Sequence, residues 1–159
     1  ALDHRSPGIV CEALLNDNYF VGLIVDGLHV HPGMVTMAWR LKGPEKSILI
    51  SDAVGALGVP SGIYEQGGME IHVSEESARL KDGTLAGSVL TLDKALRNLM
   101  QFTNSPIEQI LPALSLNPSQ LLKLTGFGAI QPGNHADMTI VDHNGFVKMT
   151  LVGGEIFTP

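Results

Sequence analysis

The chain has 159 residues, of which 44% are hydrophobic and 16% charged, and its formal net charge is −6. This size and composition are typical of an ordinary globular domain with a real core, and the lack of a Lys or Arg cluster in the sequence argues against a nucleic-acid partner. A single cysteine, Cys11, excludes an intrachain disulfide and a cysteine-based metal cage, which fits a reducing compartment. The sequence contains no run of 18 apolar residues, which a membrane span would need. We therefore expect a cytoplasmic protein with no membrane partner.

The first eight residues contain no Met start and are typical of the middle of a loop, so we expect the chain to be part of a longer protein. Residues 7–16 follow as a short helix or an irregular link, with Pro7 placed as at a first helical position. Arg5 precedes them in a loop that contains Gly and Pro. It is either a solvated surface charge or a phosphate clamp.

An apolar run rich in β-formers, residues 19–25, predicts a buried strand. The strand is followed by Asp26-Gly27-Leu28-His29-Val30-His31-Pro32, where titratable side chains enter a loop that contains Gly and Pro. His29 and His31 beside Asp26 could be metal ligands, hydrogen-bond donors to a substrate, or purely structural.

Residues 32–41 predict a helix that Gly43-Pro44 stops. Its apolar positions at helical spacing are Met34, Met37, Ala38 and Leu41. The apolar run 48–50 is too short for a stable helix and predicts a strand buried on both faces. Strand, helix and strand together predict a βαβ unit with polar residues after both strands.

Asp52 lies where the second of these strands should end, ahead of a loop of small residues. In barrels of parallel strands the carboxyl ends of the strands carry the chemistry, and a carboxylate there is a candidate general base. Taken alone, Asp52 could equally cap the next segment or start a turn.

Residues 60–80 alternate and turn as a β-hairpin insertion does, with turns at Gly67-Gly68 and, further on, at Asp82-Gly83. We expect His72 in this insertion to point to solvent. Leu85-Ala86-Gly87-Ser88 then leads into a helix over residues 90–102. These small residues either bring a backbone close to a ligand or make a tight helix entry.

Two short helices are predicted next, over residues 106–114 with Ser105 as N-cap, and over residues 117–124 with Gly126 as stop. The tail, residues 128–159, alternates between turn residues and short apolar runs. It predicts a small all-β appendage.

Several motifs occur in the order and spacing of one known family. They are His4-Arg5-Ser6-Pro7-Gly8, Asp26-Gly27-Leu28-His29-Val30-His31-Pro32, Ser51-Asp52-Ala53, Leu85-Ala86-Gly87-Ser88, Asn117-Pro118 and Gly128-Ala129-Ile130-Gln131-Pro132-Gly133-Asn134-His135-Ala136-Asp137. The chain resembles the N-acetylglucosamine-6-phosphate deacetylases of the amidohydrolase superfamily. The tail motif is shared across that superfamily, whereas the segment from Asp26 to Pro32, Asp52 after its strand, and Leu85-Ala86-Gly87-Ser88 at this spacing are specific to the deacetylases.

The resemblance implies an α/β fold that covers only a C-terminal part of the family. Residues 1–127 would be the last strands and helices of a metal-dependent (β/α)8 TIM barrel, with the β-hairpin insertion near 60–80. Residues 128–159 would be C-terminal strands of a small β-sandwich. The family's metal ligands, a Glu and two His, would lie upstream of Ala1, so the resemblance assigns no metal ligand to this chain. The metal would be a divalent ion such as Zn or Fe, and the chain alone is expected to be inactive.

The resemblance also implies roles for individual residues. Asp52 would be the catalytic acid and base. The substrate-binding residues would be Arg5, Asp26, Gly27, Leu28, His29, Leu85, Ala86 and Gly87. Arg5 matches a phosphate-binding Arg that serves its own or a neighbouring subunit's site, which implies a homodimer.

The implied activity is hydrolysis of the acetamide of N-acetylglucosamine 6-phosphate to glucosamine 6-phosphate and acetate, in amino-sugar catabolism. In the family a metal activates the water and polarises the carbonyl, and Asp52 would move the proton from the water to the leaving amine. One alternative is another amidohydrolase, acting on a cyclic amide or an acyl-amino sugar, which gives no reason for Arg5 and the Asp26 segment together. The other is a non-catalytic sugar-phosphate binding module, against which Asp52 in its expected context argues.

Overall fold

The computed structural model describes residues 2–159 as a mixed α/β fold. Its helices are α1 (Gly8–Leu15), α2 (Pro32–Lys42), α3 (Leu92–Thr103), α4 (Ile107–Ile110), the 3₁₀ helix η1 (Leu111–Leu114) and α5 (Leu116–Leu121). Its strands are β1 (Val21–Leu23), β2 (Ser47–Leu49), β3 (Gly62–Gln66), β4 (Met69–Val73), β5 (Ala78–Leu80), β6 (Leu85–Gly87), β7 (Met138–Val141), β8 (Val147–Val152) and β9 (Glu155–Phe157). None of the helices within this range has the length and apolar character needed to cross a membrane.

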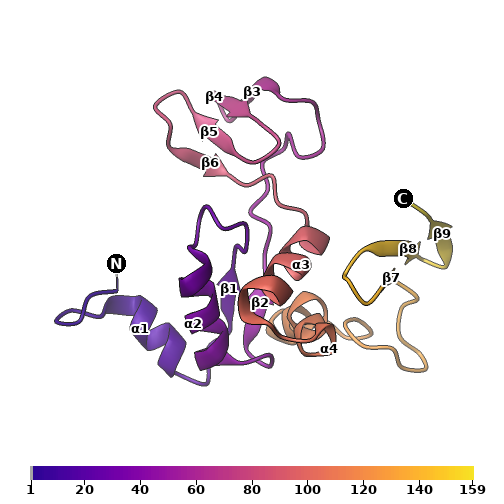
Figure 1. The fold of residues 1–159 in the computed structure, drawn as a ribbon. Coiled ribbons are helices and arrows are strands. Elements are labelled where there is room, and N and C mark those ends of the chain that lie inside the picture. Colours follow the sequence, from indigo (N-terminus) through magenta and orange to yellow (C-terminus); the bar gives the residue numbers. More distant parts are fainter. Residues whose placement is uncertain (1) are drawn as a thin grey trace.

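The predicted βαβ unit is confirmed. β1 and β2 pair in parallel, with Val21 opposite Ser47 and Leu23 opposite Leu49, and α2 connects them. Two parallel strands need such a crossover because the chain must return to the same end of the sheet. Figure 1 shows both strands at the centre, with α2 and α3 beside them.

One buried cluster joins this βαβ unit to α3 and the short helices after it. Its largest fully buried apolar side chains come from every layer and include Val25, Val35, Leu90, Leu96, Leu99 and Ile110. The helix expected over residues 90–102 is confirmed as α3, and its side chains Ala95, Leu96 and Leu99 are buried in this cluster. α3 begins at Leu92, two residues later than expected.

The core-facing side of α2 differs from the expectation. Val35, Ala38 and Trp39 are buried, whereas Met34 and Leu41 are exposed, so only part of the predicted stripe faces the core. Trp39 is the bulkiest side chain of the helix, and its indole Nε1 donates a hydrogen bond to Ser105 Oγ at 2.9 Å. The core-facing side of α2 therefore includes this large ring, which the predicted positions had left out.

Two further details of the predicted elements are wrong. Ile50 is 41% exposed because β2 ends at Leu49, so the strand is not buried over its whole predicted length. Ser105 does not cap a helix, because α4 starts at Ile107 with Pro106 as its N-cap residue and Ser105 instead accepts the Trp39 hydrogen bond. Both errors come from tertiary contacts that a local pattern cannot contain.

The predicted insertion is a four-stranded antiparallel sheet in the order β3-β4-β5-β6. The Gly67-Gly68 turn joins β3 to β4, and Asp82-Gly83 lies in the turn between β5 and β6, as expected. Leu85, Ala86 and Gly87 form the last strand of this sheet, which the sequence did not predict. His72 is exposed, as predicted, and Figure 1 shows the sheet standing above the β1–β2 pair on two neighbouring segments.

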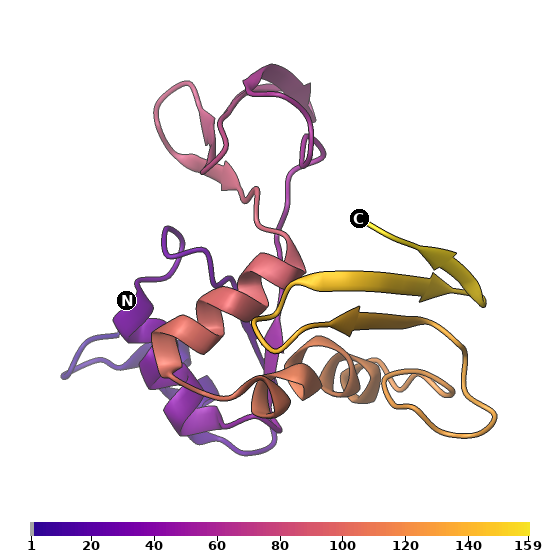
Figure 2. The same cartoon turned by 45° about the vertical axis from the view of Figure 1, so that its right-hand side comes forward.

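The tail forms the antiparallel sheet β7-β8-β9, in agreement with the predicted β appendage. Arg97 of α3 attaches it to the rest of the chain. The Arg97 guanidinium donates to the Gly145 carbonyl at 3.1 Å and lies 4.6 Å from the centre of the Phe146 ring. Figure 2 shows β8 beginning beside α3 and extending away from it.

Asn117 of α5 connects the short helices by hydrogen bonds to the start of β2, the strand that precedes Asp52. Its side chain is 2% exposed, and its amide donates to the carbonyls of Pro44 at 2.6 Å and Ser47 at 2.7 Å. Asn117→Ala removes this donor from the buried Ser47 carbonyl and the half-buried Pro44 carbonyl, so we expect a loss of about 1–3 kcal/mol in the free energy of unfolding, measured by urea denaturation.

Asn134→Ala is the matched control. The Asn134 amide donates to one carbonyl, that of Ala129 at 2.8 Å, in an exposed hydrogen bond that water can replace. This control should cost much less than Asn117→Ala. Equal losses in the two variants would contradict the role given to Asn117.

Candidate functional site

The parallel pairing of β1 and β2 places two aspartates at the same end of the sheet. Asp26 follows Leu23 by three residues, and Asp52 follows Leu49 by three residues, while Leu23 and Leu49 are paired directly. The Ile50 N–H also donates to the Leu23 carbonyl at 3.1 Å, which keeps the two chains in step beyond the strands. The carboxyl ends of parallel strands are where α/β proteins of this kind hold their ligands.

The loop after β1 folds around the carboxylate of Asp26. Oδ1 accepts from the backbone N–H groups of Leu28 and His29, both at 2.9 Å, and Oδ2 lies 2.6 Å from Nδ1 of the His29 ring. Gly27 supplies the positive φ of 81° that this tight loop requires. The side chains of Asp26 and His29 are 9% and 17% exposed, so the pair is largely removed from water.

Two opposing effects act on the acidity of Asp26. Burial alone would raise the pKa of its carboxyl, but the hydrogen bonds from His29 and the Leu28 backbone outweigh burial and hold the pKa below its ordinary value of 3.8. Asp26 is therefore a carboxylate at neutral pH.

Asp52 takes the left-handed backbone conformation, with φ at 48°, and is exposed. Asp is one of the few side chains that tolerate this region. The Asp52 carbonyl accepts from the Ser88 N–H at 2.7 Å. Within residues 2–159 its carboxylate makes no hydrogen bond or ion pair, so it is free to face a ligand or a further segment.

Leu85-Ala86-Gly87-Ser88 lies directly beside Asp52. The Val54 N–H donates to the Ser88 carbonyl at 2.9 Å, and the Ser88 hydroxyl donates to the Ser51 carbonyl. A Cβ at Gly87 would lie 3.0 Å from the Asp52 carbonyl oxygen, and the φ of Gly87 is 132°. Only glycine fits both limits, so the small residues of this motif permit a close approach to Asp52.

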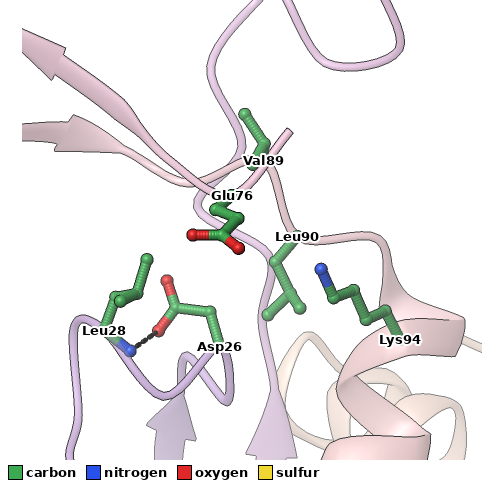
Figure 3. Close-up of a pocket in the computed structure, with 6 residues that line it drawn as sticks. All are labelled: Asp26, Leu28, Glu76, Val89, Leu90 and Lys94. Atoms are coloured by element: carbon green, nitrogen blue, oxygen red, sulfur yellow. Dashed lines mark hydrogen bonds between the residues drawn. The ribbon is translucent and has the colours of Figure 1, made fainter. Parts of the chain in front are cut away.

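A pocket of about 200 Å³ opens between the β1 loop, the insertion and the start of α3. Figure 3 shows the six residues that line it, Asp26, Leu28, Glu76, Val89, Leu90 and Lys94. Its wall therefore carries two carboxylates and one ammonium group among apolar side chains. Such a mixture suits a small polar ligand better than an apolar one.

Glu76 and Lys94 were not predicted from the sequence. Glu76 comes from the loop between β4 and β5, whose position over the β1 loop depends on how the insertion is placed. Lys94 lies in the first turn of α3, where a cation is unfavourable to the helix dipole. That local conflict is the one signal in the sequence that could have drawn attention to Lys94.

Two of the residues singled out in the sequence lie apart from this arrangement. Arg5 is exposed in the segment before α1, and its guanidinium makes no hydrogen bond or ion pair within residues 2–159. His31 is the N-cap of α2, where its Nδ1 accepts from the Gly33 N–H at 3.1 Å. His31 therefore has a structural role.

The described part of the chain does not gather three or more His, Cys, Asp or Glu side chains in a group that could hold a metal ion. The Asp26–His29 pair offers two of the right side chains, but one carboxylate oxygen and one ring nitrogen are already bonded to each other. Residues 2–159 do not fit a metal centre by themselves.

Comparison with known proteins identifies the family. The family model described as "Amidohydrolase family" matches residues 10–157. The chain therefore belongs to the amidohydrolase family.

Two curated relatives differ in how much of their length the chain spans. It is 46% identical over 153 residues to N-acetylglucosamine-6-phosphate deacetylase from Lysinibacillus sphaericus, which covers 96% of this chain and 40% of the relative. It is 33% identical over 156 residues to a protein of Escherichia coli (strain K12) named "Putative N-acetylgalactosamine-6-phosphate deacetylase", covering 98% of this chain and 93% of that relative.

A solved structure matches the whole arrangement of elements. The crystal structure of N-acetylglucosamine-6-phosphate deacetylase from Thermotoga maritima superimposes with a TM-score of 0.91 at 34% identity, over 99% of this chain and 44% of that chain. The chain thus spans about two fifths of the length of most of the deacetylases that it matches.

The lowered pKa of Asp26 gives a prediction about acid stability. A carboxyl whose pKa is lower in the folded than in the unfolded chain stabilises the fold above its unfolded pKa, and this contribution is lost as the pH falls through the folded pKa. Asp26→Asn cannot titrate. The difference in unfolding free energy between the wild-type protein and Asp26→Asn should therefore shrink as the pH falls below 3.8.

Urea denaturation at a series of pH values measures this difference. In a His29→Ala background, which lacks the ring that lowers the Asp26 pKa, the same difference should vary less with pH. A difference that stays constant from neutral pH to below 3.8 would show that Asp26 is not held as a carboxylate by its neighbours.

Proposed function

We propose that this chain carries the acid–base and sugar-phosphate-binding parts of an amidohydrolase that converts N-acetylglucosamine 6-phosphate to glucosamine 6-phosphate and acetate. The observation that carries the proposal is the common position of Asp26 and Asp52 at one end of the β1–β2 pair, with Gly87 against Asp52. The relatives bearing this name are similar to the chain over nearly its whole length. The division into a barrel part, residues 1–127, and sandwich strands, residues 128–159, belongs to the same proposal.

Asp52 is proposed as the general base and general acid. As a base it takes a proton from the attacking water, and as an acid it returns a proton to the amine nitrogen as the amide C–N bond breaks. Its exposed carboxylate is not used by any other group within residues 2–159, which leaves it free for this work. The neighbouring backbone of Leu85, Ala86 and Gly87 is proposed to contact the sugar.

The β1 loop is proposed to hold the phosphate end of the substrate. An anchor at a distance from the reacting bond improves the orientation of the amide toward Asp52. His29 lies in this loop, and Arg5 adds a guanidinium that suits a phosphate monoester. Because Arg5 is exposed and lies outside the arrangement of the β1 and β2 loops, we propose that it serves a neighbouring subunit of a homodimer.

Amidohydrolases of this kind are generally metal-dependent. The metal, for which Zn and Fe are the candidates, would be held by residues outside this chain, because the described residues gather no ligand group. We propose a cytoplasmic location, where sugar phosphates are found.

A second candidate substrate is N-acetylgalactosamine 6-phosphate, an acyl-amino sugar that differs at one hydroxyl. The relative of which the chain spans 93% bears the name of that activity, as a putative assignment. Comparing kcat/KM for the two epimers decides between them. A higher value for the galactosamine compound would replace the first candidate.

Asp52→Asn tests the chemical role. The amide keeps the shape of the carboxylate but cannot act as a base, and general acid–base catalysis contributes roughly 10²–10⁴-fold. In the active enzyme that contains these residues we expect kcat for acetate release to fall by at least about that range, with KM little changed.

Asp17→Asn, on an exposed loop, is the control and should leave kcat unchanged. Near-normal kcat in a folded Asp52→Asn enzyme would return Asp52 to the role of a turn residue.

Arg5→Ala tests the phosphate role. Loss of the guanidinium should raise KM for N-acetylglucosamine 6-phosphate by about tenfold, since hydrogen bonds between charged groups are typically worth this much. It should have little effect on the slow hydrolysis of N-acetylglucosamine, which has no phosphate. Arg40→Ala, which removes an exposed Arg from α2, is the matched control. Equal losses on both substrates would contradict a phosphate role for Arg5.

A further inference from the structure

The carboxylate of Asp26 has little capacity left for a substrate. Oδ1 already accepts two backbone N–H groups, and Oδ2 is bonded to the His29 ring at 2.6 Å. The side chain is 9% exposed. A carboxylate whose oxygens are already hydrogen-bonded and shielded from solvent stabilises its own loop and has little access to a ligand.

The His29 ring, in contrast, has one nitrogen to offer. Nδ1 is bonded to Asp26, and Nε2 makes no hydrogen bond within residues 2–159. Among the described side chains that are not exposed, no fully buried nitrogen or oxygen lacks a partner, so Nε2 must reach solvent. Nε2 is therefore the nitrogen that a ligand can meet.

We propose that Asp26 is a positioning residue, which holds the His29 ring by Nδ1 so that Nε2 is presented to the phosphate group of the substrate. This inference rests on the proposed function and replaces the expectation that Asp26 itself contacts the sugar phosphate. It assigns Asp26 and His29 different tasks within one motif.

The chemistry of the ring explains why a carboxylate is suited to this task. A carboxylate accepts the proton on Nδ1 and so fixes the ring orientation and the tautomer. Nε2 can then donate to a phosphate oxygen only when the ring carries both protons, and the Asp26 carboxylate balances the charge of that imidazolium. The pair thus presents one oriented N–H donor to a phosphate monoester.

Asp26→Asn separates this role from a simple loop role. The two backbone N–H groups of Leu28 and His29 hold the amide oxygen of Asn at the Oδ1 position, so the NH₂ group faces the ring. That NH₂ group donates to Nδ1 and drives the ring proton to Nε2. In the ¹⁵N spectrum of the intact protein, we expect the His29 proton on Nδ1 in the wild type and on Nε2 in Asp26→Asn.

Asp26→Ser is the second variant. Its hydroxyl can accept a backbone N–H in the loop but is too short to reach the ring, so it keeps the loop contact and removes the ring contact. Asp82→Asn is the matched control, because Asp82 Oδ1 accepts the Thr84 N–H in an exposed turn with no histidine bonded to it.

A double-mutant cycle in the active enzyme measures the coupling. Asp26→Ser, which leaves the ring without its partner, should raise KM for N-acetylglucosamine 6-phosphate about tenfold, with a smaller effect on kcat. Asp26→Asn should raise KM less, because its neutral ring still offers an Nε2–H donor but lacks the charge of the imidazolium. In a His29→Ala background the same changes should add almost nothing, because Asp26 then has no ring to hold. Asp82→Asn should not change KM.

Additive effects of Asp26→Ser and His29→Ala would overturn the proposal, as would an unchanged ring tautomer in Asp26→Asn. If the wild-type enzyme does not release acetate from the sugar phosphate, the proposed function fails. The tautomer in Asp26→Asn, and the binding of inorganic phosphate to the wild type and to Asp26→Ser, then still decide the role of Asp26: equal phosphate affinities would reject it, and weaker binding by Asp26→Ser would support it.

Discussion

The parallel pairing of β1 with β2 is the constraint on which the rest of the structure depends. It sets Leu23 against Leu49, and because Asp26 and Asp52 follow these residues at the same interval, both aspartates come to one end of the sheet. A slip of one residue would turn every side chain of a strand to its other face. The helix α2 and the buried contacts of Trp39 and Asn117 hold this register from outside the sheet.

The insertion is attached to the same end of the sheet by a small number of backbone contacts. Gly87 and Ser88 lie against Asp52, and the Ser88 hydroxyl, which is buried, bonds the carbonyl of Ser51 and accepts the N–H of Leu90. The small residues Gly87 and Ser88 thus allow the chain that follows the β3–β6 sheet to pack closely against the segment at Asp52. The loop between β4 and β5 then brings Glu76 over the β1 loop (Figure 3).

The sequence predicted those features that depend on neighbouring residues. The βαβ unit, the Gly67-Gly68 turn and the solvent-facing His72 all follow from local pattern, because strand alternation and positive φ are local requirements. It did not predict that Trp39 would lie on the core-facing side of α2, or that Ser105 would accept a hydrogen bond from the Trp39 ring. It also missed Glu76 and Lys94, because a pocket between two loops and a helix exists only after the elements have packed.

The central claim, that the loops after β1 and β2 form the substrate site, is tested most directly by locating the residues to which a sugar phosphate binds. We would titrate the isotopically labelled protein with glucosamine 6-phosphate, the proposed product, and follow the backbone amide resonances. The account predicts shifts at Asp26–His29, at Asp52 and at Leu85–Gly87, and none at Asn117, which lies by the residues that begin β2, at the opposite end of the sheet. Shifts confined to the Asn117 end, or no shift at any residue up to the highest soluble concentration of the compound, would contradict it.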